Sequence, residues 1–298
     1  MVKGVSLAAD ALGRDRIPEQ VFPVGTKDKK HVFPATLEQA LELRDQTDLI
    51  PCGGATDLLV GDPDPGSFFF LGQIPELKGI TECDGYLRIG SNTTFTELLE
   101  SPLIPQILKD AVSHIASPAI RNAGTIGGNI GNGTAKADTS LIMHALNAEI
   151  ELTSVDGKRV FPVHEFYRGR HDLNIADNEL ITALLIPIED IGDYMYEKVG
   201  GRKALAISRI SFAGILLEKD GIITDFRATF GAVAPTVLRF PELEAKVVGR
   251  PAAEIREQIP EIVADYADSM KFTRGRVSAE YRKEVCTNLL RNFLETRL

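Results

Sequence analysis

The chain has 298 residues and a net charge of −9, with 44% apolar and 25% charged residues, which is typical of a soluble globular protein with room for two domains. The acidic balance, with no block of lysine or arginine, argues against nucleic acid or an anionic membrane surface as a partner. The apolar runs fall far short of the roughly 18 residues that a membrane-spanning helix needs, so no membrane insertion is expected.

Residues 1–30 are polar and irregular, and we expect an extended N-terminal arm there. The arm lacks the apolar core of a secretory signal, which predicts a cytoplasmic protein. Cys52, Cys83 and Cys286 are scattered, which indicates neither a disulfide framework nor a zinc site. An iron–sulfur cluster usually takes four thiolates, so any metal or cluster must lie on another chain. We therefore predict no metal ligand and no catalytic residue here.

The first informative motif is a glycine-centred loop. Thr36 opens a capping box for a helix, and an apolar run that ends at Cys52 reads as a strand leading into the loop. The loop consists of Gly53, Gly54, Ala55, Thr56, Asp57 and Leu58. Missing side chains let the main chain approach a ligand, and consecutive amides in such a turn form an anion-binding concavity. We interpret this motif as a strand-to-helix turn.

A second glycine-centred loop follows about seventy residues later. Short strands are expected at 68–71 and 86–90, a helix with a capping box from Thr94 to about residue 102, and a helix over 105–116. The second loop contains Thr125, Ile126, Gly127, Gly128 and Asn129. Two such loops that converge on one diphosphate would hold a dinucleotide without any lysine. The alternative is that each is only a tight structural turn.

The rest of the chain alternates between helix and antiparallel strand patterns. Asp138 stands in the N-cap position of a helix over 139–146, and Asp156-Gly157 turns a hairpin. Further strands are expected at 179–186, 207–218 and 222–230, and helices at 254–266 and 278–294. Neither a P-loop nor a Rossmann glycine motif is present, and there is no nucleophile elbow. Such a chain suits a cofactor that brings its own chemistry.

The segment 115–130, with the sequence IASPAIRNAGTIGGNI, resembles the hallmark of the FAD-binding medium subunits of molybdenum hydroxylases, such as xanthine dehydrogenase and carbon monoxide dehydrogenase. The similarity runs from about residue 32 to residue 282. It includes the first loop and the Lys-x-x-x-Arg-x-Ala-x-x-Ile segment at 198–207.

The resemblance implies an α+β fold. A two-part FAD-binding domain of the vanillyl-alcohol-oxidase/MurB type is expected over 31–190, with two α/β subdomains split near residue 85. A smaller C-terminal domain of antiparallel sheet and helices is expected over 191–298.

The same resemblance implies roles for individual residues. Both loops should wrap the FAD diphosphate, with main-chain amides and the hydroxyls of Thr56 and Thr125 as donors. Asp138 is also implied to contact the cofactor, and Leu180 and Ile181 are implied to pack on the isoalloxazine ring. Lys198 is implied to lie at the polar edge of the flavin, and Arg202 along the path of a nicotinamide acceptor. The simpler alternatives are a plain helix cap for Asp138 and a solvated strand position for Lys198.

One departure from the family pattern carries a structural expectation. Ala55 stands where the family usually has a second glycine, so we expect the turn to keep φ negative there. Ile115 replaces an aromatic residue that animal xanthine dehydrogenases place against the flavin, so weaker ring stacking is expected.

The implied function is electron transfer. A partner with molybdenum cofactor would hydroxylate a substrate, a second partner would relay electrons through [2Fe-2S] clusters, and FAD on this chain would pass them to NAD⁺ or another acceptor. A dimer of heterotrimers is the expected assembly. Two alternatives stay open: a stand-alone FAD-dependent oxidoreductase of related fold, and a non-redox scaffold. The substrate of the complex cannot be read from this chain, because that pocket would lie on the molybdenum subunit.

Overall fold

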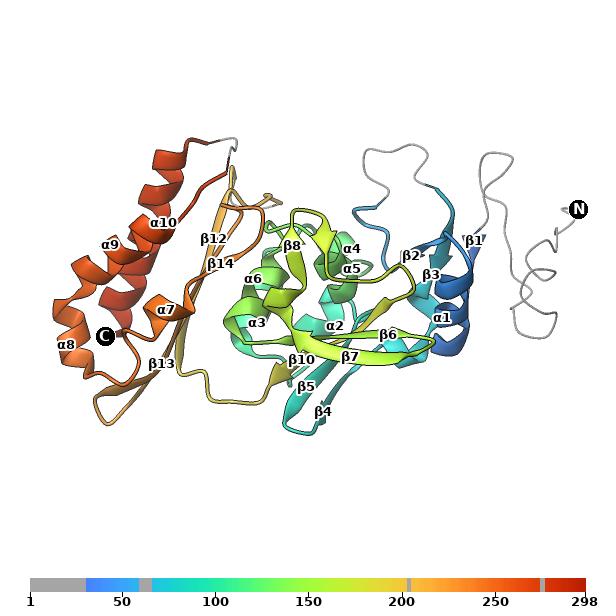
Figure 1. Cartoon of the computed structure of the whole chain (residues 1–298), viewed down its shortest axis with the longest axis horizontal. Helices are drawn as coiled ribbons and strands as arrows, with labels where there is room; N and C mark the ends of the chain where they lie inside the picture. Colours follow the sequence, from blue (N-terminus) through green and yellow to red (C-terminus); the bar gives the residue numbers. More distant parts are fainter. Residues whose placement is uncertain (1–30, 59–65, 203–204, 274–276) are drawn as a thin grey trace, which may run out of the picture.

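A computed structural model describes residues 31–58, 66–202, 205–273 and 277–298. Three blocks lie side by side along the long axis of the molecule (Figure 1). The end block is a small sheet with one helix, the middle block is a five-stranded sheet with several helices, and the C-terminal block is a four-stranded sheet covered by helices. The expected α+β class is confirmed.

The end block is a parallel sheet in the order β1-β3-β2. Its strands are β1 (His31–Val32), β2 (Ile50–Cys52) and β3 (Phe68–Phe70). Helix α1 (Leu37–Gln46) begins at the predicted cap, because the Thr36 hydroxyl accepts a hydrogen bond from the Gln39 amide. The apolar face of α1 packs against Val32 and Phe69 in one buried cluster. Two 3₁₀ turns, η1 (Leu71–Gln73) and η2 (Pro75–Leu77), lead into the middle block.

The middle block is built on an antiparallel sheet in the order β4-β5-β10-β6-β7. The strands are β4 (Ile80–Cys83), β5 (Tyr86–Gly90), β6 (Glu149–Ser154), β7 (Gly157–Pro162) and β10 (Leu180–Pro187). The predicted hairpin at Asp156-Gly157 joins β6 to β7. A short turn η3 (Val163–Glu165) and the small pair β8 (Tyr167–Gly169) and β9 (Asp172–Leu173) follow.

Five helices of the middle block lie in sequence between β5 and β6. They are α2 (Phe95–Glu100), α3 (Gln106–Ser113), α4 (Pro118–Arg121), α5 (Ile126–Gly131) and α6 (Asp138–Ala145). The predicted capping box of α2 is confirmed, with both hydrogen bonds between Thr94 and Glu97 present. All eight residues of α6 are buried, so this helix runs through the interior of the molecule.

The C-terminal block carries an antiparallel sheet in the order β11-β12-β13-β14. Its strands are β11 (Asp193–Val199), β12 (Ile210–Lys219), β13 (Ile222–Gly231) and β14 (Leu238–Arg239), followed by α7 (Pro241–Glu244), α8 (Ala252–Glu257), α9 (Ile259–Ser269) and α10 (Ala279–Arg297). The single helix expected over 254–266 is wrong, because the chain breaks at Gln258 into α8 and α9. Pro260 lies in the first turn of α9, where its missing N–H does no harm, and it could not continue α8.

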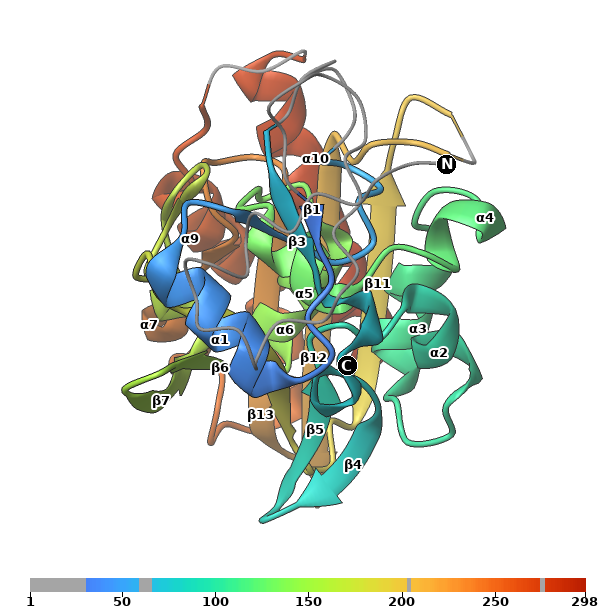
Figure 2. The same ribbon diagram turned by 90° about the vertical axis from the view of Figure 1, so that its right-hand side faces the viewer.

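The C-terminal block forms hydrogen bonds with the carboxyl end of α6. Arg227 of β13 donates to the carbonyl of Ala145 over 3.0 Å, and Arg239 of β14 donates to the carbonyl of His144 over 2.7 Å. Cations at this end of a helix satisfy its free carbonyls and oppose its dipole. On another side, β11 lies beside α3 (Figure 2), where the Tyr194 hydroxyl donates to Asp110 Oδ2 over 2.8 Å.

Among the helices of the described residues, none combines the length and the apolar character that crossing a membrane requires.

Candidate functional site

The first glycine-centred loop leaves β2 and stays a turn as far as Leu58, so the described residues show no helix directly after it. Ala55 has a φ of +56°, and the expectation of a negative φ at this position is wrong. The loop keeps the left-handed conformation that a glycine would adopt, at the cost of local strain in the alanine. The amides of Gly53, Gly54, Thr56 and Asp57 donate to no residue that the structure describes.

The second glycine segment is a short helix, not an open loop. Thr125 is the N-cap of α5, and its hydroxyl accepts a hydrogen bond from the Gly128 amide over 3.2 Å. The other three amides of this turn also have acceptors in the chain: those of Ile126 and Gly127 donate to Thr93 O and Ser91 O, and that of Asn129 donates to Thr125 O. The predicted cradle of amides over Thr125–Asn129 is therefore already engaged within the protein, apart from the amide of Thr125 itself.

The first glycine segment contacts the second at Thr125 Oγ1. A Cβ atom built on Gly53 would lie 2.7 Å from it, and one built on Gly128 would lie 2.9 Å from it. The backbone approaches more closely at Gly54, where a Cβ atom would lie 1.8 Å from the carbonyl oxygen of Ala123. Convergence of the two glycine motifs, which the sequence predicts, is thus present in the fold.

Some of the glycines are needed because backbone segments pack closely against each other there. A Cβ atom at Gly127 would lie 2.6 Å from the backbone oxygen of Ser91, which has no room to move. Gly128 is exposed, and among the described residues its Cβ atom would meet just the Thr125 hydroxyl within 4 Å. A hydrogen bond from Asn132 Nδ2 to Asp57 Oδ2, 2.8 Å long, ties the ends of the two segments together.

Several polar groups at this junction are unused. The Ser91 Oγ and Asn92 Oδ1 atoms are buried without a hydrogen-bond partner among the described residues, and Asn92 Oδ1 lies 3.3 Å from the Cβ position of Gly53. Buried polar atoms without partners are rare, so these two indicate an interaction partner beyond the described residues. The Ser91 hydroxyl and the first-loop amides without a described acceptor can donate to a ligand with many acceptor oxygens, such as a diphosphate, whereas Asn92 Oδ1 can only accept and needs a donor group.

A second cluster centres on Asp138. This residue is the first residue of α6 and not its N-cap, which is Ala137, so the predicted capping position is wrong by one residue. Its Oδ2 atom lies 2.6 Å from Lys198 Nζ, with the two side chains 5% and 9% exposed, and its Oδ1 atom accepts a hydrogen bond from Ser208 over 2.7 Å. The solvated-strand alternative for Lys198 is therefore wrong.

Lys198 also donates to the His114 carbonyl over 3.0 Å, so it joins β11 to the end of α3. The Tyr196 hydroxyl is buried beside this cluster, next to the Asp138 carboxylate. Burial, together with the negative charge and the hydrogen-bonding contact of Asp138, raises the pKa of Tyr196 far above its usual value. The cluster thus combines a buried ion pair with a buried phenol hydroxyl beside the same carboxylate.

Leu180 and Ile181 do not share one environment. Leu180 is 2% exposed and packs in the core of the end block, whereas Ile181 is half-buried and its Cδ1 atom lies 3.2 Å from the Cβ position of Gly131. Neighbouring strand residues point to opposite faces, so only Ile181 is placed to meet a ligand near α5. Arg202 is exposed, and its guanidinium donates to the Leu205 carbonyl.

Comparison with known proteins places these features in a family. The family model described as the FAD binding domain in molybdopterin dehydrogenase matches residues 27–189, and that of the CO dehydrogenase flavoprotein C-terminal domain matches residues 195–297. The chain belongs to this flavoprotein family. The resemblance stated from the sequence is therefore confirmed.

Individual relatives agree with this assignment. The chain is 34% identical over 218 residues to the putative xanthine dehydrogenase FAD-binding subunit of Escherichia coli K12, covering 70% of this chain and 74% of the relative. It is 32% identical over 233 residues to the carbon monoxide dehydrogenase medium chain of Afipia carboxidovorans, covering 76% and 79%. A chain of reconstituted CO dehydrogenase from Oligotropha carboxidovorans superposes with a TM-score of 0.83 at 28% identity, covering 93% and 100%.

As a member of this flavoprotein family, the chain is an FAD-binding subunit of an oxidoreductase of the xanthine and carbon monoxide dehydrogenase type. Sequence reasoning missed three polar residues of the site: Ser208, Tyr196 and Asn92. Tyr196 had a readable signal, because it stands two residues before Lys198 on an expected strand. Ser208 and Asn92 reach the site only through tertiary contacts, which local patterns do not encode.

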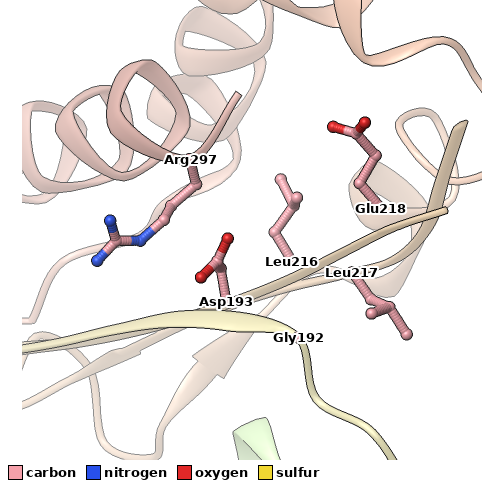
Figure 3. Close-up of a pocket in the computed structure, with 6 residues that line it drawn as sticks. All are labelled: Gly192, Asp193, Leu216, Leu217, Glu218 and Arg297. Carbon is pink, nitrogen blue, oxygen red and sulfur yellow. The ribbon is translucent and has the colours of Figure 1, made fainter. Parts of the chain in front are cut away.

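A separate depression of about 360 Å³ lies in the C-terminal block, where β11 and the end of α10 approach β12 (Figure 3). Its lining residues are Gly192, Asp193, Leu216, Leu217, Glu218 and Arg297. None of the residues predicted to bind the cofactor lines this depression.

Proposed function

We propose that the chain is the FAD-carrying electron-transfer subunit of a molybdenum hydroxylase, which passes electrons from [2Fe-2S] clusters on a partner chain through FAD to NAD⁺ or another acceptor. The observation that carries this proposal is the contact of the two glycine segments at Thr125 Oγ1, beside amides and a Ser91 hydroxyl that have no partner among the described residues. When bound, FAD supplies the conversion between one-electron delivery and two-electron release.

The diphosphate contacts come mainly from the first segment. The free amides of Gly53, Gly54, Thr56 and Asp57 are donors with no other described acceptor, and the Thr125 hydroxyl keeps its proton available because it accepts from Gly128. Since the amides of residues 126–129 are engaged within the chain, α5 contributes its N-cap side chain and the Thr125 amide. The amides of residues 126–129, which the sequence predicted as phosphate donors, are therefore not among the donors that we propose.

The ring end of the cofactor is assigned to the second cluster. Ile181 supplies an apolar contact near Gly131, while Asp138 and Lys198 supply polar ones. Because Asp138 already compensates the charge of Lys198, the net field of this pair on a ligand is smaller than that of a free lysine. Leu180 supports the strand from the core, and Arg202 stays a proposed contact on the acceptor side.

The partners follow from the relatives, which are named as medium chains and as FAD-binding subunits. We assign the molybdenum cofactor to a molybdopterin-binding large subunit and the [2Fe-2S] clusters to a small subunit. The assembly as a dimer of heterotrimers and the cytoplasm as its location stay predictions.

The proposal is tested by purifying the chain from its native source without dissociating its complexes. We expect flavin absorption bands, released FAD, and a larger and a smaller chain that carry molybdenum and iron. A colourless chain would support the scaffold alternative. A yellow chain that oxidises a small molecule without any partner would support the stand-alone oxidoreductase.

A further inference from the structure

The side chain of Asn129 on α5 is held by a hydrogen bond from the neighbouring helix α6. The Thr139 hydroxyl donates to Asn129 Oδ1 over 2.5 Å. Thr139 is fully buried, and Asn129 is half-buried. The Nδ2 group of Asn129 donates to no residue in the part of the chain that the structure describes. A carboxamide carries two N–H donors besides its acceptor oxygen, so both donors of Asn129 are available.

The same bond decides which way the carboxamide of Asn129 faces. Its two ends are chemically opposite, and the group could turn by a half rotation to place Nδ2 against Thr139 instead. The Thr139 hydroxyl has no second acceptor among the described residues, so that turn would leave its buried proton unpaired. Because an unpaired buried donor disfavours the folded state, Oδ1 stays on the side of Thr139 and Nδ2 points away from it.

Asn129 lies on the face of α5 that borders the first glycine-centred loop. Positions three and four residues apart share a face of a helix, so Asn129 shares its face with Thr125 and Asn132. Both of these contact the loop: Thr125 Oγ1 lies 2.7 Å from the Cβ position of Gly53, and Asn132 Nδ2 donates to Asp57 Oδ2 over 2.8 Å. The free donor of Asn129 therefore lies between two contacts with this loop.

We propose that the Nδ2 group of Asn129 donates to an acceptor oxygen of FAD, and that Thr139 is the positioning residue that keeps this donor turned toward the cofactor. The inference rests on the proposed function, because it requires FAD at the junction of the two glycine segments. It gives α5 a side-chain donor in place of the main-chain amide of Asn129, which donates to the Thr125 carbonyl over 3.0 Å. Thr139 is fully buried and acts through Asn129, without touching the cofactor.

The test compares two substitutions of Thr139 in the full chain, which is freed of FAD and then titrated with FAD while the flavin fluorescence is followed. Thr139→Val keeps the shape of the side chain but removes the hydroxyl. Binding of FAD would then strand Asn129 Oδ1 against a methyl group, so we expect the dissociation constant for FAD to rise about tenfold.

Thr139→Ser is the conservative variant. It keeps the hydroxyl but loses a buried methyl group, so it should melt at a lower temperature than the unchanged chain and still bind FAD with an affinity within about twofold. A threonine that only supports the fold would leave the affinity of both variants unchanged at temperatures well below their melting.

Asn129→Ala tests whether Thr139 acts through the carboxamide. This variant should bind FAD about tenfold more weakly than the unchanged chain, because the proposed donor is removed. Adding Thr139→Val to it should weaken binding no further, since no carboxamide is left to orient. A second loss as large as that of Thr139→Val alone would show that Thr139 acts by another route, and the proposal would be overturned.

Thr229→Val is the matched control in the C-terminal block. Thr229 is also fully buried, and its hydroxyl donates to the Ala213 carbonyl over 3.2 Å. Because this bond joins β13 to β12, its loss should lower the melting temperature and leave the affinity for FAD unchanged.

The outcomes separate the two proposals. If the unchanged chain binds no FAD, the proposed function and the positioning role both fail. If the unchanged chain binds FAD and Thr139→Val binds it equally well, the positioning role is overturned while the flavin assignment stands. Binding by Thr139→Ser that is as weak as that by Thr139→Val would likewise overturn it, because the hydroxyl alone would then not be what holds Asn129.

Discussion

At the scale of single residues, the glycines of the site fall into two groups with different physical reasons. Gly54 and Gly127 are required by contact between backbone segments, since a Cβ atom would lie 1.8 Å from Ala123 O and 2.6 Å from Ser91 O. Gly53 and Gly128 border the Thr125 hydroxyl, and the amide of Gly53 has no described acceptor. Substitutions in the first group should disturb the fold, and substitutions in the second should disturb the ligand.

The Gly128→Val variant tests this division. Its side chain would meet only the Thr125 hydroxyl, so we expect the fold to persist while the chain loses FAD. The measurement is flavin content after gel filtration, together with a thermal melt. Gly72→Val is the matched control, because a Cβ atom at Gly72 meets no heavy atom within 4 Å. Full FAD content in Gly128→Val would count against the site.

Ala55 offers a second test at this scale. Its φ of +56° lies in the left-handed region, which disfavours alanine relative to glycine. We expect Ala55→Gly to stabilise the chain by about 1 kcal/mol, measured as the free energy of unfolding in urea. The expectation of a negative φ at this position was wrong because it was derived from the residue type alone. In the structure, this positive φ occurs next to the close packing of Gly54 against the Ala123 carbonyl.

At the scale of elements, the sequence predicts what local chemistry controls. The capping box at Thr94 and the hairpin at Asp156-Gly157 form as expected, because their hydrogen bonds join residues close in sequence, within one helical turn or one hairpin. The second glycine motif was expected as an open loop and forms α5, because Thr93 and Ser91 supply acceptors for its first amides. Acceptors that come from elsewhere in the chain cannot be read from a local pattern.

Helix α6 carries a pH-dependent contribution to stability. Burial lowers the pKa of His144 to about 4, from an ordinary value of 6.5. The unfolded chain therefore binds a proton more readily than the folded chain between these values, and stability is lost as the pH falls from about 6.5 toward 4.

A His144→Phe variant should remove that dependence while keeping a ring against Tyr167, whose centroid lies 5.6 Å away. We expect a flatter dependence of melting temperature on pH over this range than in the unchanged chain. His164→Phe, at a side chain that is 68% exposed, is the control: it removes one charge neighbour of His144 but not its burial, so most of the slope should remain. An equally steep slope in both variants would show that other groups cause it.

At the scale of the whole molecule, α6 is the joint between the middle and C-terminal blocks. Its first residue, Asp138, pairs with Lys198 of β11, and its last carbonyls accept from Arg227 and Arg239. The eight residues of this helix span only about 12 Å, so the contacts at its two ends act on one short rigid helix. None of these contacts was predicted as a pair, because each joins residues at least sixty positions apart.

Arg239 is the contact whose removal best tests the joint. Its guanidinium binds both oxygens of Glu244, which is 5% exposed, as well as the His144 carbonyl and the side chain of Asn147. In Arg239→Met, the Glu244 carboxylate stays buried without its cation, which should lower the free energy of unfolding by about 3 kcal/mol. One of the two arginine contacts with the carbonyl end of α6 is lost at the same time while Arg227 keeps the other, so the C-terminal block should unfold in a calorimetric transition of its own at lower temperature.

Arg250→Met is the matched control for this loss, since it removes an arginine of the same block from a pair with Glu254 in which the side chains are 32% and 48% exposed. Partly exposed pairs of this kind contribute at most about 1 kcal/mol, so we expect a single transition at nearly the original temperature. Equal shifts in both variants, or one transition in Arg239→Met, would mean that the C-terminal block is held to the middle block by contacts other than those of Arg239. Separate transitions would instead show that Arg239, at the carboxyl end of α6, couples the unfolding of the two blocks.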